Sequence, residues 1–188
     1  IRDAARLWIE NSKLCSVLYG PIKFWNTSKI TNMRRLFFNQ THFNEDISQW
    51  DVTQVKDMSG MFTRAVKFNC NLNGWNTVSV EDMSYMFYEA SSFNSDLTDW
   101  NVSSVKNTSW MFYSAVSFTG SSLSHWNTVS VQDMSCMFFG AILFNCNLND
   151  WNTSNVLDMN GMFSGSVRFS SELRSWDVSS VKDMSYMF

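Results

Sequence analysis

Seven tryptophans recur at a nearly constant interval along this 188-residue chain, and they constrain its fold more than any other feature. Neighbouring members of the set are 25 residues apart, except for one interval of 26: Trp25, Trp50, Trp75, Trp100, Trp126, Trp151 and Trp176. Internal repeats with periods of roughly 20 to 50 residues are typical of solenoids, propellers and arrays. A propeller blade needs about 40 residues or more, so the shorter unit favours one coil of a solenoid.

The composition excludes several classes of protein. The chain has 9 Trp, 16 Phe and 12 Met but only 7 Gly and 1 Pro, which excludes collagen, flexible linkers and disordered tails. Its formal net charge of −3 argues against a nucleic-acid partner held by phosphate contacts. No apolar run approaches the ~18 residues of a membrane helix, so we expect no membrane span in this segment.

Two local patterns alternate within each unit. Apolar residues after each Trp follow a helical stripe of about three turns; the third unit has Val80, Met83, Met86, Phe87 and Ala90. Ser79 and Asp82 have the Ser-x-x-Asp spacing of a helix N-terminus. Around Trp itself, β-branched residues such as Val102 predict a short strand of about four residues. Because strands stack more closely than helices, we predict an α/β solenoid of strand-helix coils with a parallel sheet on its concave face.

We expect two regions along the chain. Residues 1–24 form an N-terminal helical cap, since Ala4, Leu7 and Trp8 share one helical face. Residues 25–188 form one domain, a solenoid of seven units of which the last is partial. Met187 and Phe188 in that last unit still need a neighbour, so we expect a longer array or self-association through the uncapped C-terminal coil.

The repeated motif resembles a known family. W-D-V-x-x-V-x-D-M-S-x-M-F, with F-N-x-D-[IL]-x-x-W, is similar to the BspA-like leucine-rich-repeat surface proteins, also known as the DUF285 repeat family. The match runs from Trp25 to Phe188, and Leu7-Trp8 with Tyr19-Gly20 is similar to the cap before such arrays. The resemblance implies a leucine-rich-repeat-like fold, a secreted or cell-surface location, and a role in adhesion or protein binding without shared catalytic residues.

Five Asn-x-Ser/Thr sequons agree with that location: Asn26, Asn39, Asn101, Asn107 and Asn152. We expect a glycan on at least one of them. Three sequons directly follow Trp, where the repeat itself supplies Asn, so the alternative is a ladder of Asn and Asp side chains bonded to backbone groups between coils. A Cys136–Cys146 disulfide is sterically possible, but free buried thiols are the favoured interpretation.

Groups for catalysis or metal binding do not gather in the sequence. It has 2 His, no Cys-x-x-Cys and no Gly-rich phosphate loop, so we expect no enzyme, no cofactor and no metal site. One acidic column would suit calcium in principle, but helix capping explains it without a metal. That column contains Asp57, Asp82, Asp133, Asp158 and Asp183.

Contact residues should lie in columns where the repeat does not fix the residue type. Positions just before Trp vary and would project from the concave strands, which makes Gln49, Asp99, His125 and Asp150 binding candidates. A second variable column on the expected helix side offers contact aromatics, although burial between helices is the alternative. These aromatics are Tyr85, Trp110 and Tyr186. The extra residue within 119–122 should form a bulge on a return loop.

These patterns together predict a non-enzymatic extracellular or cell-surface scaffold for protein–protein interaction or adhesion, with a protein or surface-glycan partner. The alternative is a structural subunit that stacks end to end into a filament or sheath, with or without a glycan coat. The uncapped coil that ends at Phe188 motivates that alternative.

Overall fold

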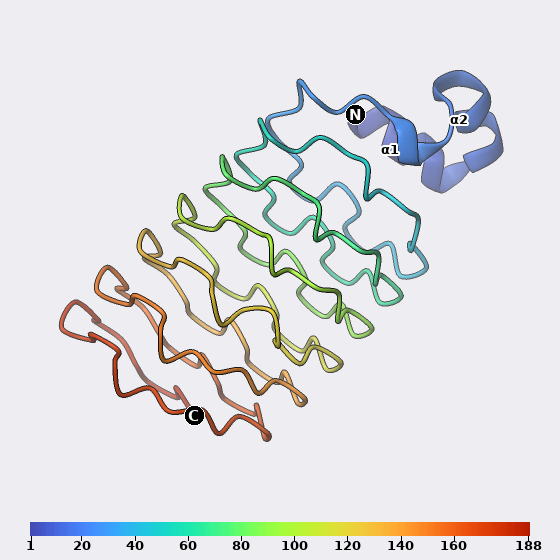
Figure 1. Ribbon diagram of the computed structural model, residues 1–188. Helices are drawn as coiled ribbons and strands as arrows, with labels where there is room; N and C mark the ends of the chain where they lie inside the picture. The colour runs from blue at the N-terminus through green and yellow to red at the C-terminus, as the bar shows by residue number, and fades with distance from the viewer.

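A computed structural model describes residues 1–188 and shows helices at the N-terminal end only. These are α1 (Arg2–Glu10), α2 (Ser12–Tyr19) and the short 3-10 helix η1 (Ile22–Phe24). The remaining chain winds as a stack of similar coils that leads away from the helices (Figure 1). We number the coils 1 to 7, each beginning at one Trp of the repeated set: 25–49, 50–74, 75–99, 100–125, 126–150, 151–175 and 176–188.

The predicted α/β solenoid, with its leucine-rich-repeat-like coils and parallel sheet, is wrong. No helix follows η1, and no residue lies in an extended strand. Pairing of the β type is limited to isolated parallel bridges at one residue per coil: Asn32, Asp57, Asp82, Asn107, Asp133, Asp158 and Asp183. The coils are built from linked turns, and 80 of the 90 backbone hydrogen bonds therefore lie outside the helices.

Consecutive turns replace the predicted helix in every coil. In coil 3, Met86 N donates to Met83 O within a turn, whereas Tyr85 N donates to Ser109 O of coil 4 at 2.9 Å. Tyr85 and Glu89 have φ of 57° and 53°, so the chain reverses twice where an α-helix would need negative φ throughout. The predicted apolar stripe is still buried, because its residues point inward from successive turns.

The expected strand around each Trp does not form, and hydrogen bonds from side chains link the coils there instead. Trp100 Nε1, at the start of coil 4, donates to the carbonyl of Leu72, near the end of coil 2, at 2.9 Å. Thr77 Oγ1 donates to the carbonyl of Asn101 in the following coil at 2.9 Å. The backbone N–H of Trp100 donates to Leu97 O, in the turn that leads from coil 3 into coil 4. Neighbouring backbones are therefore joined here through side chains, and no sheet ladder forms.

The prediction that the Ser-x-x-Asp spacing caps a helix is also wrong. The aspartates of this motif form turns instead. Asp82 Oδ1 accepts from the backbone N–H of Ser84, two residues later, at 2.8 Å. Such Asx turns use the side chain in place of a backbone carbonyl. Two further columns make the same turn, as Asp96 does with Thr98 in coil 3. Asx turns thus supply the corners that a chain poor in Gly and Pro needs.

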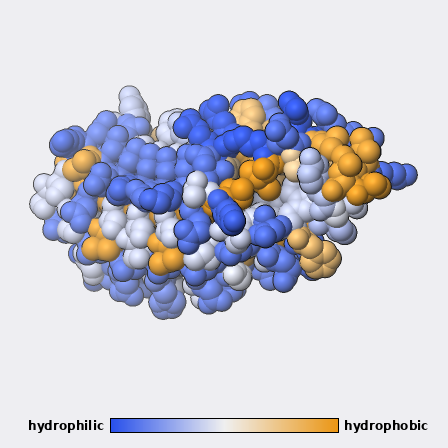
Figure 2. Space-filling model, turned by 90° about the horizontal axis from the view of Figure 1, so that it is seen from above, coloured by the Kyte–Doolittle hydropathy of each residue, from blue (hydrophilic) through white to orange (hydrophobic).

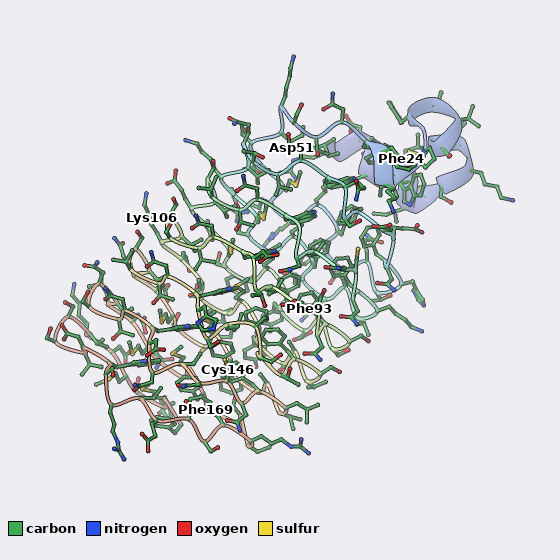
Figure 3. The ribbon with its side chains drawn as sticks, viewed as in Figure 1. Phe24, Asp51, Phe93, Lys106, Cys146 and Phe169 are labelled. Atoms are coloured by element: carbon green, nitrogen blue, oxygen red, sulfur yellow. The ribbon has the colours of Figure 1, made fainter.

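Aromatic side chains fill the core in stacks that run along the molecule. Phe87 and Phe112 of adjacent coils stack with centroids 5.6 Å apart, and Trp100 and Trp126 stack at 6.4 Å. Phe93 belongs to a further column and packs 3.8 Å from Phe87. Figure 3 shows Phe93 and Cys146 inside the coils and Lys106 at their edge. All four cysteines are free thiols, so no Cys136–Cys146 disulfide is formed.

Surface polarity differs between the helical end and the coils. Most of the surface seen in Figure 2 is hydrophilic, with hydrophobic residues gathered toward the end that carries the helices. On α2, Leu14, Val17 and Leu18 are exposed. Neither α1 nor α2 is long and apolar enough to cross a membrane.

The extra residue of coil 4 forms an additional turn. Leu123 N donates to Gly120 O at 2.9 Å. Gly120 is buried with a φ of 75°, and a Cβ there would lie 2.2 Å from the ring of Phe144. This insertion is accommodated because glycine fits against the neighbouring coil.

Candidate functional site

The residues predicted before each Trp lie on exposed turns. Gln49, Asp99, His125 and Asp150 are all exposed, but there is no concave sheet from which they could project. Asp99 is tied to coil 2, since its Oδ2 accepts from Asn73 Nδ2 at 2.8 Å and its N–H donates to Asn73 Oδ1 at 2.9 Å. At Asp99, this column therefore joins neighbouring turns.

The second variable column has a left-handed backbone in every coil. Its φ values run from 52° to 62° over Arg35, Gly60, Tyr85, Trp110, Cys136, Gly161 and Tyr186. Bulky side chains rarely adopt positive φ, and such positions cluster at functional sites in proteins. The column lies on turns, and the prediction that it lies on a helix is wrong.

Two of the three predicted contact aromatics come together on this face. Tyr85 stacks on Trp110 with centroids 5.7 Å apart and an interplanar angle of 4°. Beside them, Tyr88 stacks on Tyr113 at 4.7 Å, and Tyr113 stacks on Phe139 at 4.9 Å. We call these five residues the aromatic platform. Tyr186 lies in coil 7, outside the platform, and is 78% exposed.

A groove opens where the platform is interrupted. In coil 2, Gly60 stands in the column of Tyr85, and Thr63 stands in the column of Tyr88. The resulting hollow, which we call the coil-2 groove, has a volume of about 480 Å³. Its walls come from coil 1 on one side and from coils 3 and 4 on the other: Arg34, Arg35 and Phe38 face Tyr85, Tyr88 and Trp110. That volume lies within the range of small-ligand sites.

Arginines give the groove a positive charge. Arg64 Nε lies 2.7 Å from Glu89 Oε2, and its guanidinium is 5.9 Å from the ring centre of Tyr88. Arg35 lies 5.2 Å from the ring centre of Phe38 but has no carboxylate partner, and Arg34 has none either. Two guanidinium groups are thus free to meet an anion.

Burial raises the pKa of the Tyr85 hydroxyl, and the charges of Asp133 and Cys136 act in the same direction, whereas Arg35 opposes them. Burial also raises the pKa of Tyr88. Both phenols therefore remain protonated near neutral pH and can donate hydrogen bonds.

The sequon asparagines mostly make turns within their own coil. Asn101 Oδ1 accepts from Ser103 N at 3.0 Å and from Ser103 Oγ at 2.6 Å. Equivalent bonds hold Asn26, Asn107 and Asn152, while Asn39 has a φ of 60°. All five except Asn107 are exposed. Glycosylation of these residues stays a prediction.

A ladder of asparagines between coils does exist, but in a different column from the one considered above. Asn69 N donates to Asn44 Oδ1 at 2.8 Å, and Asn94 N donates to Asn69 Oδ1 at 2.9 Å. Elsewhere, the acidic column that includes Asp82 is engaged in Asx turns. No three His, Cys, Asp or Glu side chains converge as metal ligands.

Sequence reasoning missed most of the groove. It identified Tyr85 and Trp110 but not the arginines or the neighbouring ring column. The signal lay one residue after the buried Phe of each unit, where the chain has Phe38, Thr63, Tyr88, Tyr113, Phe139 and Ser164. In this column, aromatic residues in three successive coils mark the platform. Thr63, in the same coil as Gly60, marks the gap beside it.

Comparison with known proteins identifies one family. A family model described as "Mycoplasma protein of unknown function, DUF285" matches residues 9–123 and 110–188. No curated protein and no solved structure matches the chain.

Proposed function

The chain belongs to the DUF285 family, and from that premise we propose that it is a non-enzymatic scaffold that binds a protein or glycan partner on a cell surface or outside the cell. The coil-2 groove is the observation that carries this proposal. The resemblance of the Trp and Phe motifs to BspA-like surface proteins supports the secreted or cell-surface location.

The groove has the composition of a recognition site. Tyr, Trp and Arg are the residue types most enriched where binding energy concentrates, and Tyr85, Trp110 and Arg35 are held together here. Their backbone is fixed by bonds between coils, as in Arg35 N to Ser59 O at 2.9 Å. A rigid site loses little conformational entropy when a partner binds.

The groove is less suited to catalysis. General acid–base chemistry needs a group that titrates near the operating pH. The groove contains no His or Cys, and Asp82 Oδ1 is occupied by the N–H of Ser84. Its arginines and phenols can hold a ligand but do not exchange protons readily near neutrality.

The test is binding of fluorescently labelled protein to intact animal and bacterial cells, measured by flow cytometry. We expect saturable binding that Gly60→Tyr abolishes by filling the groove. Gly161→Tyr is the matched control, because Gly161 occupies the same column in coil 6 and Tyr already occurs there at Tyr85 and Tyr186. Absence of saturable binding, or equal loss in both variants, would reject the proposal.

Two further measurements accompany this test. Antibodies against the chain should label unpermeabilised source cells or detect the chain in their medium. Light scattering should give a monomer mass that does not change with concentration. A mass that rises steadily with concentration would instead favour the filament or sheath alternative.

A further inference from the structure

We propose that the coil-2 groove binds a pyranose sugar that carries a carboxylate or sulfate group, an inference that rests on the binding function proposed above. The groove offers three complementary features for such a ligand. These are a free aromatic face, unpaired guanidinium groups and hydroxyls without partners.

The aromatic face belongs to Tyr85. One face of its ring is covered by Trp110 at 5.7 Å, while the position next to it on the other side is Gly60, which has no side chain. Tyr85 is 42% exposed as a result. The face of an aromatic ring is electronegative, so it attracts the C–H groups on the flat side of a sugar ring.

Two guanidinium groups, those of Arg34 and Arg35, line the groove together with that face. A Cβ at Gly60 would lie 3.2 Å from Arg35 Cγ, so the Arg35 stem passes over Gly60. The planar guanidinium of an arginine matches a carboxylate or sulfate through two parallel hydrogen bonds. Because Arg34 and Arg35 have no acidic partner while Arg64 is paired with Glu89, an anionic ligand would meet the first two.

Free hydroxyls complete the lining. No hydrogen bond engages the side-chain oxygens of Ser84 or Tyr85, although Ser84 N is bonded to Asp82. The Tyr88 hydroxyl, by contrast, interacts with the Glu89 carboxylate. Thr63 Oγ1 is also already used, because it donates to Tyr85 O at 2.7 Å. The free hydroxyls of Ser84 and Tyr85 can exchange hydrogen bonds with sugar hydroxyls.

An acidic peptide fits this groove less well. Strand addition needs free backbone groups at an edge, but Arg35 N, Gly60 N and Tyr85 N all donate to the next coil. A helix in a groove needs a long apolar channel, whereas this hollow is interrupted by arginines and is one coil wide. The isolated hollow suits a single ring better than a peptide backbone.

Isothermal titration calorimetry of the full chain with four probes tests the proposal. A disaccharide that ends in glucuronate tests the carboxylate source, and a galactose 6-sulfate disaccharide tests the sulfate source. Lactose is the neutral control, and tetraglutamate is the peptide control. We expect at least one acidic sugar to bind about tenfold or more tighter than lactose, as charged hydrogen bonds allow, and tetraglutamate to bind no better than lactose.

Variants separate the contributions. Arg35→Gln should reduce the preference for the acidic sugar to near that for lactose. Tyr85→Gly should weaken binding of every sugar, and glycine suits this backbone because Gly60 and Gly161 share the column. Gly60→Tyr should abolish sugar binding, while Gly161→Tyr should not affect it.

Three results would overturn the inference: tetraglutamate binding as tightly as the acidic sugars, no preference for an acidic sugar over lactose, or unchanged sugar binding in Gly60→Tyr. If cells still bind the chain and Gly60→Tyr still prevents this, the proposed scaffold function stands and only the sugar class is wrong. If cell binding is absent as well, both proposals fail.

Discussion

Residues with a left-handed backbone conformation recur at the turns of this chain. All nine non-glycine residues with positive φ fall into two columns of the repeat: Arg35, Tyr85, Trp110, Cys136 and Tyr186 in one, and Asn39, Arg64, Glu89 and Ser114 in the other. Each such residue costs about 1–2 kcal/mol. The cost is offset because all of them except Tyr186 donate a backbone hydrogen bond to the next coil, as Arg64 N does to Tyr88 O at 2.7 Å.

Replacing a left-handed serine by glycine should stabilise the chain. Ser114 has a φ of 50°, its hydroxyl makes no hydrogen bond, and Gly140 and Gly165 already occupy its column. We expect Ser114→Gly to raise the free energy of unfolding by about 0.5–1 kcal/mol in urea, since relief of strain outweighs the greater chain entropy of glycine. Ser117→Gly is the control: Ser117 has no positive φ, so this substitution should destabilise. Equal destabilisation by both would contradict the argument.

Asx-turn carboxylates should make the stability depend on pH. The Thr98 hydroxyl and backbone N–H lower the pKa of Asp96, and Ser179 and Ser185 act similarly on Asp177 and Asp183. A lowered folded-state pKa contributes stability above the unfolded value of about 3.9, and this contribution is lost as pH falls through the folded pKa. The chain should therefore lose thermal stability below about pH 4.

Replacing Asp96 by asparagine should remove the pH dependence of stability that this one Asx turn contributes. Asn71 occupies the column of Asp96 and accepts from Asn73 N at 2.9 Å without titrating. We expect Asp96→Asn to fold normally and to flatten the fall of Tm between about pH 5 and 3. Circular dichroism melts across that range give the measurement. Parallel curves for the variant and the parent chain would show that the Asp96 carboxylate contributes nothing.

At the scale of the coil, side-chain hydrogen bonds hold neighbours together where no ladder exists. Thr77 Oγ1 donates to Asn101 O, whereas Val52 and Val102 occupy the same column without a donor. We expect Thr77→Val to lower the free energy of unfolding by about 0.5–1.5 kcal/mol in urea, the value of one hydrogen bond. The reciprocal substitution Val52→Thr should lower the free energy of unfolding by less than Thr77→Val does. The reverse order would show that these bonds do not stabilise the stack.

The period and inward-facing residues of a coil follow from the sequence, but its backbone path does not. Val80, Met83, Met86 and Ala90 have a spacing that both a helix and a chain of three-residue turns would bury. The difference lies in the positive φ of Tyr85, a residue type that gives no sign of that conformation. Glycines at equivalent positions in other coils, such as Gly60 and Gly161, were the available signal.

The proposed binding groove could likewise be predicted from the sequence only in part. Tyr85 and Trp110 could be chosen from sequence because they stand out in a variable column, although they were assigned to a helix. Arg35 and Gly60 share that column, but their importance depends on a side chain missing from one coil between two filled ones. Such a gap has meaning only once the stacking of adjacent coils is known.

For the whole molecule, regular stacking turns a local sequence change into a surface feature. Each coil contacts mainly its neighbours, as in other repeat proteins, so equivalent side chains form continuous columns. A column of stacked rings leaves no space for a ligand, whereas one small residue within it opens a hollow with rigid walls. Gly60 and Thr63 do this together in coil 2, where the hollow is lined by Arg34 and Arg35. Coil 6 has a similar pair, Gly161 and Ser164, but neither residue lines this hollow.

The overall architecture has a direct spectroscopic signature. The helices α1 and α2 have nine and eight residues, and the coils have none. Far-UV circular dichroism should therefore show little helix, although an α/β solenoid with a helix in every coil would show a strong helical signal. Near-UV circular dichroism should be intense, because Trp75, Trp100, Trp126 and Trp151 stack in a fixed geometry. Both signals should disappear together on heating, since the stacks and the coils depend on the same contacts between neighbours. A strong helical spectrum would contradict the turn-built coil and restore the helix that the sequence pattern predicts.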